Sequence, residues 1–135
     1  MKPLVYVVDN DPVLLFLMSK LMERTKFADT PEFYENGSDA LLGIRKIYNQ
    51  EDVFVIFLDL NMPEMNGWEF LDELDKFTSL SNTIVFMISS SVDTIDKEKA
   101  NGHWRISEFL IKPIEESKLL ELKNEIEKGG KFLKS

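Results

Sequence analysis

A small set of polar side chains stands where apolar runs of the sequence stop. Its members are Asp9, Asn10, Asp11, Asp59, Ser89 and Lys112. Carboxylate and amide oxygens are hard ligands that suit Mg2+, which prefers oxygen and keeps several of its waters. A lysine ammonium can neutralise a phosphoryl group, and a serine hydroxyl can donate a hydrogen bond to a phosphoryl oxygen. The set therefore predicts phosphoryl transfer to a carboxylate.

Asp59 is the expected nucleophile of this transfer, because it closes the apolar run 53–58. A metal ion and Lys112 would offset the charge that develops on the oxygens of the transferring group. The sequence has neither a G-x-x-x-x-G-K-[ST] loop nor a G-x-G-x-x-G turn, the motifs that cradle nucleotide phosphates. The phosphoryl donor is therefore expected to be another molecule, most simply another protein.

These residues are far apart in the sequence, so a fold must bring them together. Apolar runs predict strands over residues 4–8, about 30–34, 53–58, 83–88 and 106–111. Helical spacing predicts helices over residues 12–24, 40–47, 66–77, 93–101 and 115–128, before a loose tail at 131–135. This alternation predicts a parallel α/β sheet with helices on both faces, whose strands all present their carboxyl ends at one edge.

Polar residues mark three of the expected helix starts. Asp11, followed by proline, suits an N-cap. Asn66 and Glu69 suit a reciprocal capping pair, and either Asn36 or Ser38 could cap the second helix. For Asp11 two roles stay open, because the same carboxylate could also serve as a metal ligand.

The bulk composition limits the classes of protein that the chain could be. Its 135 residues suit one domain, and a net charge of -8 argues against nucleic acid as a direct partner. The absence of cysteine excludes disulfides and thiolate metal sites. The first apolar run is too short for a signal peptide or a membrane span, so we expect a cytoplasmic protein that does not contact membranes.

Four stretches of the sequence resemble the receiver domain of two-component response regulators. They are Val7-Val8-Asp9-Asn10-Asp11-Pro12, Asp59-Leu60-Asn61-Met62-Pro63-Glu64-Met65-Asn66-Gly67, Ser89-Ser90-Ser91 and Lys112-Pro113. They occur in the order and at the spacing of that family, and the resemblance covers residues 3–128. It implies a flavodoxin-like (βα)5 fold with strand order 2-1-3-4-5, in a domain over residues 1–128 with a short tail at 129–135. It also implies Mg2+-dependent phosphorylation of Asp59 by a histidine kinase or phosphotransfer protein.

The resemblance also implies a ligand set for the metal. Asp9 falls on the first member of the family's acidic pair, and Asn10 falls on the second, which usually is an aspartate that contacts the metal directly. An asparagine keeps an oxygen ligand but carries no charge, so we expect weaker Mg2+ binding. Asp59 completes the side-chain ligands, and Asn61 falls where the family offers a backbone carbonyl to the metal.

Three further positions match residues that signal phosphorylation in the family. Ser89 falls on the Ser/Thr switch position, Phe109 on the aromatic switch position, and Lys112 on the family's lysine. Phosphate on Asp59 would then draw Ser89 inward and let the Phe109 ring turn into the vacated space. Trp104 lies in an unusual stretch before the fifth strand, and the sequence leaves open whether it anchors a partner or packs on that strand.

A stand-alone receiver is therefore the expected function, as a monomer or weak homodimer that acts on a downstream protein or relays the phosphoryl group. Such a protein is not an enzyme, although it contributes to its own phosphorylation and dephosphorylation. A phosphatase or mutase with an aspartyl-phosphate intermediate is a second hypothesis, but those enzymes typically need an acidic residue where Asn61 stands. A third hypothesis, which Asn10 favours, is a degenerate receiver that binds its partner without being phosphorylated.

Overall fold

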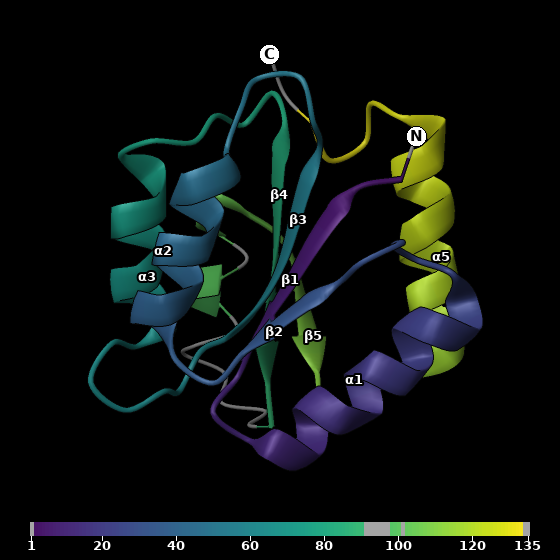
Figure 1. Cartoon of the computed structure of the whole chain (residues 1–135), viewed down its shortest axis with the longest axis horizontal. Coiled ribbons are helices and arrows are strands. Elements are labelled where there is room, and N and C mark those ends of the chain that lie inside the picture. The colour runs from purple at the N-terminus through teal and green to yellow at the C-terminus, as the bar shows by residue number, and fades with distance from the viewer. Residues whose placement is uncertain (1, 91–97, 101, 134–135) are drawn as a thin grey trace.

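The structure is a computed structural model that describes residues 2–90, 98–100 and 102–133, and it alternates strands and helices along the chain (Figure 1). Its strands are β1 (Leu4–Val8), β2 (Glu32–Tyr34), β3 (Phe54–Asp59), β4 (Thr83–Ser89) and β5 (Ile106–Ile111). Its helices are α1 (Pro12–Thr25), α2 (Gly37–Ile47), α3 (Gly67–Asp75) and α5 (Glu116–Lys128). These elements match the predicted alternation to within a few residues at each end.

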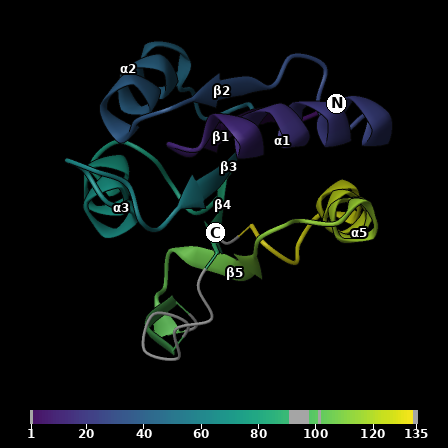
Figure 2. The same ribbon diagram turned by 90° about the horizontal axis from the view of Figure 1, so that it is seen from below.

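The five strands form one sheet in the order β2-β1-β3-β4-β5, and all neighbouring strands are parallel. The view along the strands in Figure 2 shows α2 and α3 on one face of the sheet and α1 and α5 on the other. This is the flavodoxin-like arrangement with the predicted strand order, so the fold prediction is confirmed.

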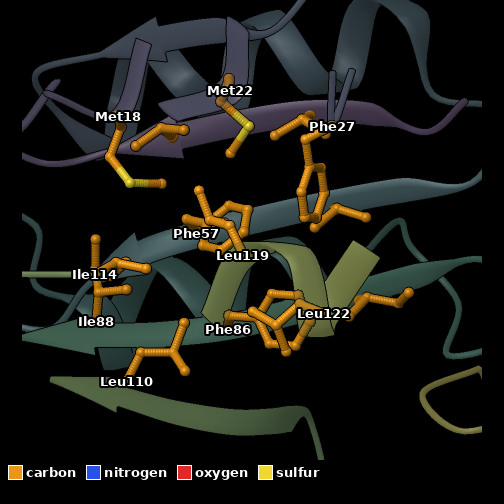
Figure 3. Close-up of a cluster of buried hydrophobic side chains, with 14 of the residues drawn as sticks. Met18, Met22, Phe27, Phe57, Phe86, Ile88, Leu110, Ile114, Leu119 and Leu122 are labelled. Atoms are coloured by element: carbon orange, nitrogen blue, oxygen red, sulfur yellow. The ribbon is translucent and has the colours of Figure 1, made fainter. Parts of the chain in front are cut away.

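The two central strands explain why their sequences are apolar at every position. All residues of β3 and β4 are buried, because helices cover both faces of the sheet. On the α1 and α5 face, the rings of Phe57 and Phe86 lie 5.2 Å apart, among side chains that Figure 3 shows as one cluster. On the α2 and α3 face, Leu58 and Met87 belong to a second cluster. Successive residues of each strand therefore serve opposite halves of the core.

The polar residues predicted to begin helices do so. The Asp11 side chain accepts a hydrogen bond of 2.9 Å from the backbone N–H two residues later and caps α1. Asn66 and Glu69 exchange reciprocal bonds of 2.9 and 3.0 Å at the start of α3. Of the two candidates for the N-cap of α2, Asn36 and Ser38, it is Asn36 that caps the helix. Its side chain accepts a 2.8 Å hydrogen bond from the backbone N–H of Asp39. These caps fix where each helix leaves the edge of the sheet.

Two predictions at the ends of elements have a different outcome. The predicted helix over 93–101 lies largely outside the described residues, of which 98–100 are helical. The prediction of a loose tail over 131–135 is wrong for Phe132, which is buried and lies edge-on to Phe86 with ring centroids 5.2 Å apart. An aromatic side chain just beyond the last helix can reach the core because Gly129 and Gly130 turn the backbone with positive φ.

Candidate functional site

The carboxyl ends of the strands bring the predicted set of polar residues together, toward the lower side of Figure 1. Asp9 directly follows β1, Asp59 and Ser89 are the last residues of β3 and β4, and Lys112 directly follows β5. The strand register aligns these ends, because Val8 pairs with Leu58, Asp59 with Ile88, and Ser89 with Ile111. Stretches of chain more than a hundred positions apart therefore meet at one edge of the sheet.

Lys112 joins the two buried carboxylates of the site. Its Nζ lies 2.6 Å from Oδ2 of Asp9 and 3.6 Å from Oδ1 of Asp59. Asp9 is fully buried, and its Oδ2 has no hydrogen bond from any described residue besides this ion pair. Because an unpaired buried carboxylate is costly, the ammonium of Lys112 offsets the cost of placing Asp9 in the core.

Asp59 is almost completely buried, with 3% of its surface exposed. Its Oδ1 accepts a 3.2 Å hydrogen bond from the backbone N–H of Asn61. Burial, and then the negative charge of Asp9, raise the pKa of Asp59 from 3.8 to about 6, although Lys112 pulls it down. A carboxylate with a raised pKa holds its electron pair less stably and is a better nucleophile once it is ionised.

In the loop that starts at Asp9, the Asp9 side chain is buried, whereas those of Asn10 and Asp11 are exposed. Oδ1 of Asp9 accepts a 2.8 Å hydrogen bond from the backbone N–H of Asp11. Asp11 is exposed and one of its carboxylate oxygens caps α1, so its role as a helix cap is confirmed. Asn10 is exposed at the same edge of the sheet, between the two aspartates.

The residues at this edge fit a divalent cation that prefers oxygen ligands. Oδ2 of Asp9 is a buried oxygen without a hydrogen bond, Asp59 provides a second carboxylate, and the Asn10 amide stands at the exposed rim. The described residues contain no group of three His, Cys, Asp or Glu side chains that could hold a metal. The donor set therefore suits Mg2+ in chemical type but carries only two negative charges, because Asn10 is neutral.

Gly67 lets the loop after Asp59 fold back against the end of β3. Its N–H donates a 2.9 Å hydrogen bond to the carbonyl of Leu60. A Cβ atom at this position would lie 3.0 Å from the Asp59 carbonyl oxygen and 3.0 Å from the Leu60 Cα. Only glycine avoids this contact, and sequence reasoning missed it because a dipeptide such as Asn66-Gly67 indicates a turn without showing what the turn approaches.

The two predicted switch residues lie on neighbouring strands. Ser89 is fully buried at the end of β4, and its carbonyl accepts a 2.8 Å hydrogen bond from the backbone N–H of Lys112. Phe109 is half-buried in β5, opposite Met87, and packs against the core cluster of the α2 and α3 face. Ser89 thus belongs to the edge that holds Asp59, whereas Phe109 stands further back along its strand.

The segment before β5 contains the residue that sequence reasoning missed most completely. Arg105 is 2% exposed, and its Nε lies 2.9 Å from Oδ1 of Asp75. Trp104 beside it is 58% exposed. Of the two roles left open for Trp104, this exposure favours the partner anchor over packing on the fifth strand. The sequence does not indicate that Arg105 is buried, because its partner, Asp75 at the end of α3, is distant in the sequence.

The sequence of this chain is similar to those of known proteins. A family model described as the response regulator receiver domain matches residues 5–124. Protein PilH of Pseudomonas aeruginosa is 27% identical over 127 residues, which cover 93% of this chain and 98% of PilH. Several longer curated relatives also match, and the chain spans between 18% and 56% of their lengths. Among the described residues, no helix is long and apolar enough to cross a membrane.

Solved structures show the same arrangement. The crystal structure of a two-component response regulator from Cytophaga hutchinsonii has 25% identity and a TM-score of 0.84, and the match covers 96% of this chain and 100% of that one. A response regulator receiver protein from Dyadobacter fermentans has 30% identity and a TM-score of 0.78, with 87% and 92% covered. With a family model over most of its length and these likenesses, the chain belongs to the response regulator receiver domain family.

Proposed function

We propose that this receiver accepts a phosphoryl group on Asp59 from a histidine kinase or a phosphotransfer protein. One observation carries the proposal: Asp59 ends β3 at the sheet edge where the Nζ of Lys112 lies 3.6 Å from its carboxylate. The alternative roles of a buried aspartate are structural, and they do not explain why a second buried carboxylate, Asp9, is placed beside it. Two like charges at one edge are costly, and a site for a cation and a phosphoryl group makes use of them.

The transfer follows from the groups at the edge. An ionised oxygen of Asp59 attacks phosphorus, a P–O bond forms, and the bond from phosphorus to the imidazole nitrogen of the donor breaks. The donor histidine leaves as a neutral imidazole after it has taken up a proton. Lys112 stands where its ammonium can offset the added negative charge, and the Ser89 hydroxyl stands at the same strand edge to donate to a phosphoryl oxygen.

Asp9, Asn10, Asp59 and the backbone carbonyl of Asn61 are the residues that would hold Mg2+. When bound, the ion would supply positive charge that offsets the charge of the phosphoryl oxygens. Asp9 and Asp59 contribute the two negative charges of the set, and Lys112 competes for both of them. Because Asn10 is neutral, we propose that this receiver needs more Mg2+ than one with a third acid at that position.

Output through protein binding completes the proposal. Ser89 and Phe109 lie on adjacent strands, so a movement of Ser89 toward a phosphoryl group would change the space beside β5. The half-buried Phe109 ring would then turn inward and alter the surface around β5 and α5. The partner would be a downstream protein or the next member of a phosphorelay.

The proposal is tested by intact-mass spectrometry after incubation with acetyl phosphate. We expect the wild-type protein to gain one phosphoryl group when Mg2+ is present, and Asp59→Asn to gain none. EDTA should suppress the adduct. A degenerate receiver that binds partners without phosphorylation would show no adduct in the wild type at any Mg2+ concentration, and that result would overturn the proposal.

A further inference from the structure

We propose that Trp104 anchors a docking surface for a basic partner segment, one that inserts an arginine or lysine side chain over the indole. This inference names the chemistry of the downstream partner that the proposed function requires. The surface consists of Trp68, His103 and Trp104, which we call the aromatic platform. They are both tryptophans and the only histidine of the sequence.

The three rings of the platform lie in succession, with Trp104 stacked on His103 and Trp68 tilted by 36° to it. The His103 ring lies between the two tryptophans, 5.8 Å from the Trp68 centroid and 6.0 Å from the Trp104 centroid. It is nearly parallel to Trp104, with an interplanar angle of 15°. Trp68 is only half-buried and Trp104 is 58% exposed, so the stack runs from the start of α3 outward to solvent.

Buried polar contacts hold Trp104 in place at the edge of this stack. The Nε of Arg105 lies 2.9 Å from Oδ1 of Asp75, and an Nη of the same guanidinium donates to the Thr78 hydroxyl. The Arg105 backbone N–H donates a 3.1 Å hydrogen bond to Nδ1 of His103. These contacts anchor the backbone next to Trp104, and the indole itself is held by its stacking on the His103 ring. A fixed aromatic side chain loses little entropy on binding, which is a property of interface anchors.

The platform already holds a cation from this chain. The Nζ of Lys99 lies 4.3 Å from the centroid of the Trp68 ring, within the range of a cation–π contact. Trp104 offers the same kind of ring with far more of its surface exposed. The Arg105 guanidinium carbon lies 6.0 Å from the Trp104 centroid, at the far limit of such a contact, and the exposed remainder of the ring is where we propose that a partner's cation binds.

The charges around the platform favour a basic partner. α3 contains four acidic residues and no basic one, and the chain as a whole carries a net charge of -8. Asp72 lies one helical turn after Trp68 on the same face of α3 and is exposed. None of the described ion pairs includes Asp72, so its charge is available to a cation that approaches the indole. The cations beside the platform are Lys99, which contacts the Trp68 ring, and Arg105, which is paired with Asp75. The exposed carboxylates of Glu69 and Asp72 would repel an acidic segment.

The test uses fluorescence anisotropy of labelled peptides with the full chain. The probes are a short arginine-rich peptide, a lysine-rich peptide and an acidic peptide, all of equal length. We expect the wild type to bind both basic peptides and not the acidic one, and Trp104→Ala to lose about fivefold in affinity for them. Trp104→Phe should keep part of the affinity. The matched control is Leu42→Ala, which removes an equally exposed apolar side chain from α2 and should bind like the wild type.

Two outcomes would overturn the inference. Equal affinities of wild type, Trp104→Ala and Leu42→Ala would mean that basic peptides bind only through the net charge. Binding of the acidic peptide as tight as that of the basic ones would mean that the platform is not selective for cations. Acetyl phosphate labelling of Trp104→Ala should equal that of the wild type, so a failure of the docking surface is distinguishable from a failure of phosphorylation at Asp59.

Discussion

The ammonium of Lys112 lies closer to Asp9 than to Asp59, at 2.6 Å against 3.6 Å. Asp9 therefore receives most of the charge compensation, while Asp59 keeps a raised pKa because it is buried and faces a second carboxylate. Because of this uneven pairing, the Asp59 carboxylate keeps a raised pKa, while the charge of Asp9 is offset by Lys112. Several properties of the protein in metal-free buffer depend on it.

Replacing Lys112 by glutamine should destabilise the protein at pH 8. The change leaves Asp9 and Asp59 buried without a cation, and breaking a buried pair of this kind costs roughly 3–5 kcal/mol of the free energy of unfolding. At pH 5 the loss should be smaller, because Asp59 then takes up a proton and the repulsion disappears. Urea denaturation in EDTA at the two pH values measures both quantities. A loss that is the same at pH 5 and pH 8 would show that the charge of Lys112 is not what matters.

Asp59→Asn should be more stable than the wild type above pH 6 in metal-free buffer. The pKa of Asp59 is about 6 in the folded protein against an ordinary value of 3.8, so the folded state binds the proton more tightly. The stability that the protonated Asp59 contributes is therefore complete below about pH 4, and it is lost as the pH rises through 6. The ionised carboxylate then costs up to about 3 kcal/mol. The neutral amide avoids this cost.

The measurement for this prediction is the free energy of unfolding of both proteins between pH 4 and pH 8, with EDTA present. The two curves should converge toward pH 4 and separate through pH 6. A matched control is Asp72→Asn, which removes an exposed carboxylate of α3 and should not reproduce the separation. Parallel curves for wild type and Asp59→Asn would contradict the assigned environment of the acceptor.

Gly67→Ala should disturb the acceptor loop, whereas Gly102→Ala should not. A Cβ at Gly67 would meet backbone atoms of Asp59 and Leu60 at 3.0 Å, and a Cβ at Gly102 would meet nothing within 4 Å. Crowding against backbone costs roughly 1–3 kcal/mol, because backbone cannot move aside as a side chain can. Thermal unfolding compares the variants, and acetyl phosphate labelling shows whether Asp59 has shifted. Equal stabilities of the two variants would mean that the loop is not in close contact with β3.

Asn10→Asp should tighten Mg2+ binding, by roughly tenfold in dissociation constant for the added charge. Isothermal titration calorimetry with MgCl2 measures the change directly and does not depend on phosphorylation. Asn124→Asp adds the same charge at an exposed position of α5 and serves as the control. If both variants bind Mg2+ like the wild type, Asn10 is not a ligand of the ion.

The sequence predicted the sheet order and the convergence of Asp9, Asp59 and Lys112. Each of these residues follows or ends an apolar run that can be recognised locally, and a parallel sheet brings the ends of such runs to one edge. It also predicted the caps at Asp11 and Asn66, since these depend on residues only two or three positions apart. It did not predict the burial of Arg105 or Phe132. Each depends on a partner, Asp75 or Phe86, that is distant in sequence and carries no pattern of its own.

The most direct test is to locate the phosphoryl group after labelling with acetyl phosphate and Mg2+. Reduction with borohydride converts an aspartyl phosphate to homoserine, and peptide mass mapping then identifies the labelled position. We predict homoserine at position 59 and nowhere else. Homoserine at Asp9 or Asp11, or no conversion at all, would contradict the assignment of Asp59 as the phosphoryl acceptor.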